Sequence, residues 1–280
     1  MENKGFRKAV VIFIDVLGTR DRTQFAEWYQ IANIFYGTVQ REKELDKAHE
    51  YVVYKREIHV FSDCAYIIYD YKDSVEDERK DANALMAIAC YNTEKVLYEF
   101  LKNGFIVRGA LTYGDIYYES DRDIFFGPAM NIAYDLESKT AKYPRVIIDS
   151  TFAEQLVAYN DVTYRKEELQ RVMNGEIIKK DDDGEYFIHY LNSLELGMNH
   201  MEGREVVKKA LELCDIERNK KCEDGRKKQS IKDKYDWLEL YVKNSAHKVE
   251  RMENIDITDP EVMREIELQE LELIRNLISR

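Results

Sequence analysis

Residues 9–18 read Ala-Val-Val-Ile-Phe-Ile-Asp-Val-Leu-Gly, and the fold is organised around this stretch. Six apolar residues, mostly β-branched or aromatic, lead to Asp15. A run that is apolar at both alternating positions is typical of a central strand covered on both faces. Asp15 stands where this strand leaves the core. Its carboxylate is therefore either a metal ligand or a cap for the next helix.

The composition indicates a folded protein with an acidic surface. Of the 280 residues, 45% are apolar and 12% are aromatic, which is ample for a buried core. The 54 acidic residues outnumber the 42 basic ones and give a net charge of −12. This balance argues against DNA as a partner, because a duplex-binding protein presents a basic face to the phosphates. A nucleotide substrate is still compatible with it, because a divalent metal can supply positive charge locally.

The chain carries no sequence signal for export or membrane insertion. No window approaches the roughly 18 consecutive apolar residues of a membrane span. Residues 1–8 lack the architecture of a signal peptide and lead directly into the first strand. The four cysteines are scattered without zinc spacing: Cys64, Cys90, Cys214 and Cys222. We therefore expect free thiols, no membrane span and a cytoplasmic location.

The order of the elements predicts an α+β fold. Periodicity and turn residues predict a βα unit, a hairpin, a second helix and a fourth strand, at residues 9–16, 25–35, 51–61, 64–69, 82–102 and 105–113. Thr19 and Asp21 are expected to cap the first helix, and Gly104 to close the second. Gly114-Asp115 is expected to turn the chain into a short strand at 116–118. A helix at 129–139 and a strand at 145–149 follow. This order is that of a ferredoxin-like core with additions.

The second half of the chain is less regular. Strands at 176–179 and 185–190 flank Asp181-Asp182-Asp183-Gly184, which predicts an exposed hairpin with a solvated acidic turn rather than a calcium loop. Charged helices are expected at 204–219, 231–249 and 259–278. We expect a catalytic domain at residues 1–195 and a charged helical extension at 196–280 that packs on or near the core.

Two acids are the main candidates for chemistry. Asp15 ends the first strand and Asp63 lies at the tip of the hairpin; in a ferredoxin-like sheet these strands are neighbours. Two converging carboxylates can hold Mg²⁺ or Mn²⁺, and a pair of such ions can clamp the oxygens of a phosphoryl transfer. The structural alternatives are a helix cap for Asp15 and a turn residue for Asp63.

Four pieces of the sequence together resemble the class III nucleotidyl cyclases. They are Phe-Ile-Asp-Val-Leu-Gly at 13–18, Phe-Ser-Asp at 61–63, Ile-Val-Arg-Gly-Ala-Leu-Thr-Tyr-Gly-Asp at 106–115, and Gly-Pro-Ala-Met-Asn-Ile-Ala-Tyr-Asp-Leu-Glu-Ser at 127–138. The resemblance runs over residues 10–138 and implies a class III cyclase catalytic core. It departs from the family at His59, where a purine-reading lysine is expected, and at Asp135, where a transition-state arginine is expected. Asn131 is retained.

The altered pattern resembles one branch of that family. The Phe-Ser-Asp turn, the Gly-Pro-Ala helix start and the helical C-terminus with Tyr235-Asp236-Trp237-Leu238 are similar to the pyrimidine cyclases of bacterial Pycsar anti-phage systems. The resemblance implies conversion of UTP to 3′,5′-cyclic UMP and pyrophosphate, as a signal read by a separate effector. A cytidylate cyclase making cyclic CMP is the alternative.

The resemblance also implies a site. Asp15, Asp63 and the backbone carbonyl of Val16 would hold two Mn²⁺ or Mg²⁺ ions, while the ribose 3′-hydroxyl attacks the α-phosphorus. Arg108 is the candidate for contacting phosphates or base; its alternative is a rim arginine paired with an acid. We expect four residues to line the pyrimidine triphosphate: Phe13, Tyr54, Arg56 and His59.

The resemblance implies a homodimer with shared sites. One subunit would supply the metal aspartates and the other Asn131. Two competing functions stay open at this point. One is a catalytically inactive homologue that binds a nucleotide as a sensor, which the Asp135 substitution motivates. The other is a different phosphoryl-transfer enzyme that joins two nucleotides with the same pair of aspartates.

Overall fold

The computed structural model describes residues 5–164, 176–195, 200–220, 225–253 and 264. Its first six main elements are β1 (Arg7–Val16), α1 (Phe25–Phe35), β2 (Tyr54–Phe61), β3 (Cys64–Tyr71), α3 (Ala82–Lys102) and β4 (Val107–Glu119), with α2 (Arg41–Ala48) after α1. The strands lie in the order β2-β3-β1-β4, and β1 is antiparallel to both β3 and β4. This is a ferredoxin-like core, which confirms the predicted α+β class.

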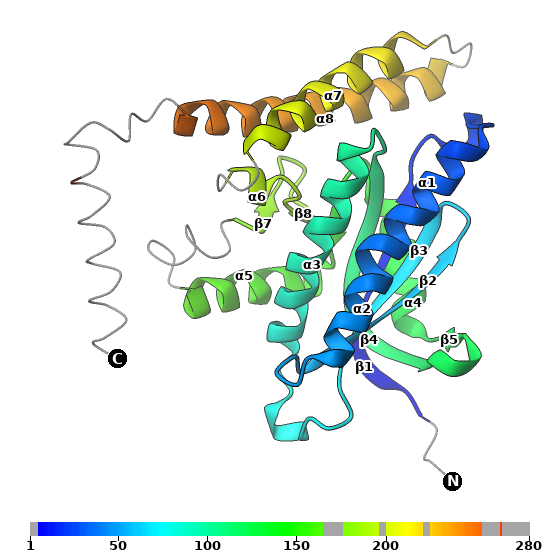
Figure 1. Ribbon diagram of the computed structural model, residues 1–280, viewed down its shortest axis with the longest axis vertical. Helices are drawn as coiled ribbons and strands as arrows, with labels where there is room; N and C mark the ends of the chain where they lie inside the picture. Colours follow the sequence, from blue (N-terminus) through cyan, green and yellow to red (C-terminus); the bar gives the residue numbers. More distant parts are fainter. Residues whose placement is uncertain (1–4, 165–175, 196–199, 221–224, 254–263, 265–280) are drawn as a thin grey trace.

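The central position of β1 explains its apolar sequence. Val10, Ile12 and Ile14 belong to the hydrophobic cluster that contains residues of α1 and α3. The alternate residues Val11 and Phe13 belong to a second cluster on the other face, against α4 (Pro128–Asp135). Figure 1 shows α1 and α3 side by side along one face of the sheet. Both faces of β1 are therefore buried, as its sequence predicts.

Strand β4 is longer than predicted, and the turn expected at Gly114-Asp115 is wrong. β4 continues to Glu119, and its end pairs with β5 (Ile124–Phe126) around a turn that contains Asp123 at φ 53°. Gly114 pairs with Ala9 of β1. A Cβ at Gly114 would lie 3.2 Å from the Cβ of Ala129, so this glycine makes room for α4 rather than for a turn.

The expected cap of α1 is also wrong. Thr19 and Asp21 lie in a short 3₁₀ turn, and α1 begins at Phe25 after Gln24, whose side chain makes no cap hydrogen bond. Gly104 does follow α3 at φ 78°, as predicted for its C-cap. Thr19 is therefore available for a different contact.

The sheet extends on the other side of β4. Strand β6 (Val146–Ile148) is parallel to β4, and the hairpin of β7 (Ile178–Lys180) and β8 (Tyr186–Ile188) joins it through β8. The helix α5 (Ser150–Tyr164) follows β6. The prediction that the acidic turn of this hairpin is solvated is wrong. Asp181 and Asp183 both form ion pairs with Arg145, which is fully buried.

The C-terminal helices pack on the core. After the short α6 (Asn192–Glu195), α7 (His200–Asn219) and α8 (Gly225–Glu253) lie side by side across one end of the molecule (Figure 1). Val206, Leu238 and Val242 belong to the same hydrophobic cluster as Ile12 of β1. The third helix predicted at 259–278 lies outside the described residues. No helix in the described part of the chain is both long and apolar enough to cross a membrane.

Candidate active site

Asp15 and Asp63 meet at one end of the central strands. Asp15 pairs with Cys64 of β3 on one side and with Arg108 of β4 on the other. The main-chain N–H of Val16 donates to the carbonyl of Asp63 at 2.9 Å, so the hairpin turn is fastened directly to the end of β1. The structure therefore brings together the two aspartates that the sequence paired.

The charge around Asp15 is predominantly negative. Burial, together with the negative charges of Glu137 and Asp63, raises the pKa of Asp15 from 3.8 to about 6, against the opposing effect of Arg108 and Lys234. Burial and the charges of Asp15 and Asp63 also raise the pKa of the Cys64 thiol to about 11. A site with this excess of negative charge is suited to bind a cation.

Asp63 is held by a contact that the sequence did not reveal. The hydroxyl of Thr19, a buried residue in the turn after β1, donates to Oδ2 of Asp63. Gly18, at φ 78°, lets the chain reverse directly after β1 and carries Thr19 back toward the hairpin. The hydroxyl fixes one carboxylate oxygen of Asp63.

The donor set fits a hard divalent cation. Among the described residues there is no cluster of three or more His, Cys, Asp or Glu side chains placed to bind a metal. The donors present are the carboxylates of Asp15 and Asp63, and Mg²⁺ and Mn²⁺ prefer oxygen ligands of this kind. The side chain of Val16 is buried in the core, so this residue can contribute only its main-chain carbonyl.

Arg108 is paired with a buried acid. Its Nε donates to Oε1 of Glu137 at 2.5 Å, and its Nη2 contacts the same oxygen. Glu137 is 3% exposed and lies in the turn that follows α4. This ion pair corresponds to the alternative interpretation of Arg108, an arginine paired with an acid. Glu137 was missed as a site residue, although it stands in the Leu-Glu-Ser end of the fourth cyclase-like piece.

His59 and Phe13 lie on the same face of the sheet as Asp15. Nδ1 of His59 is 2.7 Å from Oδ1 of Asp123, and its ring stacks on Phe125 with centroids 3.8 Å apart. The ring of Phe13 contacts Tyr66 at a centroid distance of 4.8 Å. Aromatic side chains therefore cover the face beside the aspartates.

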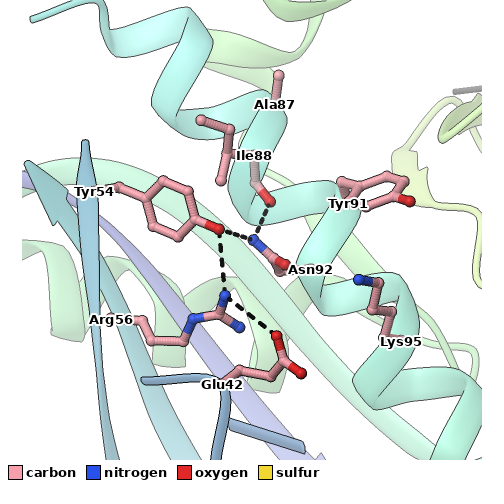
Figure 2. A pocket seen from close by; sticks show the side chains of 8 residues that line it. All are labelled: Glu42, Tyr54, Arg56, Ala87, Ile88, Tyr91, Asn92 and Lys95. Atoms are coloured by element: carbon pink, nitrogen blue, oxygen red, sulfur yellow. Dashed lines mark hydrogen bonds and ion pairs between the residues drawn. The ribbon is translucent and has the colours of Figure 1, made fainter. Parts of the chain in front are cut away.

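Tyr54 and Arg56 lie on the face of the sheet opposite to Asp15. The prediction that they line a pocket beside Asp15 is therefore wrong. Figure 2 shows both side chains pointing from β2 toward α3, where they line a cavity of about 290 Å³. Arg56 is 3% exposed and its Nε donates to Asp46 at 2.5 Å. The Tyr54 hydroxyl accepts from Arg56 and from Asn92. These contacts give both residues a structural role in the packing of β2 against α2 and α3.

Asn131 is exposed on α4. Among the described residues no hydrogen bond joins it to Asp15 or Asp63. Its neighbours Ile132 and Tyr134 are 42% and 51% exposed, and Asp135 pairs with Lys139 at 2.9 Å. A single chain therefore presents Asn131 outward, on a partly apolar surface.

Comparison with known proteins finds similarity in structure alone. No protein-family model and no curated protein sequence matches the chain. The guanylyl cyclase domain of the RhoGC fusion protein from the fungus Blastocladiella emersonii is 14% identical, with a TM-score of 0.43 over 66% of this chain and 96% of that domain. The guanylate cyclase domain of RhGC from Catenaria anguillulae, solved with GTP, is 16% identical, with a TM-score of 0.43 over 66% and 97%.

A bacterial light-regulated adenylyl cyclase is also similar, at 11% identity and a TM-score of 0.39, over 73% of this chain and 59% of that one. These three similar structures are all of nucleotidyl cyclases. At this level of similarity, no residue's role carries over from those proteins to this chain.

Proposed function

We propose that this protein is a divalent-metal-dependent nucleotidyl cyclase that converts UTP to 3′,5′-cyclic UMP and pyrophosphate. The observation that carries the proposal is the pairing of Asp15 and Asp63 at the end of β1, with the pKa of Asp15 raised by burial and by its acidic neighbours. Four cyclase-like sequence pieces occur in order around this pair. Cyclic CMP from CTP is the alternative product.

The reaction needs positioning and neutralisation of charge. The 3′-oxygen of the ribose forms a bond to the α-phosphorus, the bond from that phosphorus to the bridging oxygen of the β-phosphate breaks, and the hydroxyl proton is released. Two Mg²⁺ or Mn²⁺ ions held by Asp15, Asp63 and the Val16 carbonyl would supply the charge that favours an ionised 3′-oxygen and a leaving pyrophosphate. Thr19 keeps Asp63 in one orientation, which pre-organises the site.

The sheet face next to Asp63 supports a small base. His59, Phe125 and Tyr66 are packed together there, with Phe125 against both other rings. Nδ1 of His59 is 2.7 Å from the carboxylate of Asp123, and its Nε2 is buried with no partner among the described residues. The bulk of the aromatic cluster favours one ring over two.

A homodimer would complete the site. Three apolar side chains are about half exposed on the face that carries α4: Phe61, Ile132 and Tyr134. A second copy that covers them would bring Asn131 of one subunit toward the aspartates of the other. By its resemblance to the Pycsar cyclases, the enzyme would act in the cytoplasm, and its product would activate a separate effector in anti-phage defence.

The test is an activity assay on purified protein with Mn²⁺ or Mg²⁺ and each of the four ribonucleoside triphosphates. We expect cyclic UMP and pyrophosphate in equal amounts, and no product from Asp15→Ala or Asp63→Ala. Asp21→Ala, an acid in the turn after β1 that is outside the proposed site, is the matched control and should keep full activity. Absence of cyclic product from all four substrates, with folded dimeric protein, would falsify the proposal.

A nucleotide sensor without turnover is the second candidate. Two observations favour it: Arg108 is engaged by Glu137, and Asp135 occupies the position where the family pattern has an arginine. Calorimetry with UTP and Mn²⁺ separates the two functions. Stoichiometric binding without cyclic product, retained in Asp15→Ala, would identify the sensor.

A further inference from the structure

Helix α8 is anchored beside the candidate site by aromatic and charged contacts. The ring of Trp237 stacks on Tyr143 with centroids 5.7 Å apart and planes within 5°. Its Nε1 donates to Oδ2 of Asp181 at 2.6 Å. Asp181 and Asp183 pair with the buried Arg145, and the Arg145 guanidinium lies 5.6 Å from the Trp237 ring. This cluster joins α8 to the start of β6 and to the β7–β8 turn.

The anchor lies next to the strand that carries Arg108. The main-chain N–H of Gly109 donates to the carbonyl of Arg145 at 3.1 Å. Lys234 precedes Trp237 by three residues, which is about one helical turn and places both side chains on the same side of α8. Lys234 therefore lies on the side of α8 that faces the start of β6, beside the strand β4 whose Arg108 pairs with Asp15 of β1.

The electrostatic surroundings of Lys234 agree with this placement. Arg108, Asp15 and Glu137 are the three charged groups that act on it. Burial and the charge of Arg108 lower the pKa of Lys234, and the two acids oppose that effect. Lys234 thus belongs to the same charge cluster as the candidate metal ligands.

Lys234 differs from Lys232 and Lys243 of the same helix. Lys232 and Lys243 are largely exposed and form ion pairs with Asp236 and Glu239, four residues away. Lys234 is half-buried, and the described residues offer it no hydrogen bond or ion pair. A partly desolvated ammonium group with three unused donors is suited to bind an anion.

We propose that Lys234 is a phosphate-binding residue of the active site, which contacts the triphosphate of the bound nucleotide from the C-terminal helix. The proposal rests on the proposed function. It answers a deficit of positive charge: Arg108 is engaged by Glu137, and Asp135 has the wrong charge to stabilise a phosphate. The site is then built from the first strand and from a helix more than 200 residues later in the sequence.

The experiment compares Lys234→Gln and Lys234→Arg with Lys232→Gln, the exposed lysine of the same helix. Binding of UTP, UMP and uridine is measured by calorimetry with Mn²⁺, and kcat and KM are measured with UTP. We expect Lys234→Gln to weaken UTP binding about 10- to 100-fold, the effect of one lost charge-assisted hydrogen bond. Uridine binding should be unchanged, Lys234→Arg should recover part of the loss, and Lys232→Gln should behave as the wild type.

The outcomes separate the two proposals. Equal UTP affinity in Lys234→Gln and the wild type overturns the role of Lys234, even if the wild type is an active cyclase. An equal loss of uridine and UTP affinity also overturns it, because that result indicates a structural role for α8. If UTP binding depends on Lys234 while no cyclic product forms, Lys234 keeps its role and the cyclase proposal fails.

Discussion

Asp15 links the chemistry of the site to the stability of the fold. Its carboxylate is half-buried beside two other acids, so the pKa of Asp15 rises from 3.8 to about 6 on folding. Above pH 6 the carboxylate is charged in both the folded and the unfolded protein. Because the charge is unfavourable only in the folded environment, it destabilises the folded state. As the pH falls from 6 toward 3.8 the folded protein takes up the proton first, so this group disfavours folding less at lower pH.

Asp15→Asn should therefore stabilise the metal-free protein while it abolishes activity. The amide removes the half-buried charge, and we expect a gain of about 1 kcal/mol in the free energy of unfolding at pH 7.5, after allowance for solvent screening. Thermal unfolding with a chelator present measures it. The gain should fall to about half at pH 5 and disappear only below about pH 3.8, where the carboxylate is protonated in the unfolded protein as well. A loss of stability at pH 7.5 would contradict the charge environment described for Asp15.

The affinity of the site for a divalent metal should decrease at acidic pH, with a midpoint near the pKa of Asp15, about 6. Ligand carboxylates must be deprotonated to bind a cation, so protons compete with Mn²⁺ at Asp15. We expect the apparent affinity for Mn²⁺ to be constant above pH 7 and to decrease about tenfold for each unit of pH below about 6. Titration of Mn²⁺ followed by electron paramagnetic resonance tests this. A midpoint near pH 4, the range of an ordinary aspartate, would count against it.

The residues of the site differ in how far the sequence could place them. Asp15 and Asp63 were paired correctly, because each ends a strand and the two strands are neighbours in the predicted fold. His59 and Arg56 were assigned to one pocket, although they are three residues apart on one strand and side chains alternate between its faces. That alternation was a usable signal. Lys234 and Thr19 had no such signal, because their positions depend on how a helix and a turn pack onto the sheet.

Among the elements, α8 connects the C-terminal region to the site through Trp237. The sequence predicted a helix here with an apolar face, and the structure confirms it at Gly225–Glu253. The partner of that face could not be predicted, because Asp181 and Arg145 come from a hairpin and a strand of irregular sequence. The length of β4 was underestimated for a related reason: Gly114 was interpreted as a turn residue, whereas it makes room for Ala129.

Trp237→Ala should weaken both the fold and substrate binding. The change removes the stack on Tyr143 and the hydrogen bond to Asp181, and we expect a loss of about 2–4 kcal/mol in stability. UTP affinity should fall at a temperature where the variant is still folded, because Lys234 is no longer held beside Arg108. Denaturant unfolding and calorimetry measure the two effects. Leu240→Ala, an exposed position on the same helix, is the control and should change neither.

At the scale of the whole molecule, a shared site predicts complementation between inactive variants. Asp15→Ala removes a proposed metal ligand, and Asn131→Ala removes the residue expected from the partner subunit. A mixed dimer then holds one site with both defects and one site with neither. Random exchange makes half of the dimers mixed, so an equal mixture should recover about a quarter of the wild-type activity.

Mixing after brief partial denaturation, followed by the cyclase assay, tests this complementation. Asp15→Ala mixed with Asp63→Ala is the control, because both changes fall in the same half of the site and every site then keeps one defect. No recovery in the first mixture, with mixed dimers shown by mass spectrometry, would place Asn131 outside the partner's site.

The position of β1 has a consequence for how the protein is made. β1 emerges from the ribosome before either of its neighbours, and Asp15 pairs with Cys64 and Arg108, which are 49 and 93 residues later in the sequence. At synthesis rates of about 5–20 residues per second, the apolar faces of β1 remain without their second partner for roughly 5–20 seconds. During that interval the nascent chain exposes a strand with high aggregation potential. Production of this protein should therefore depend on chaperones that act on nascent chains.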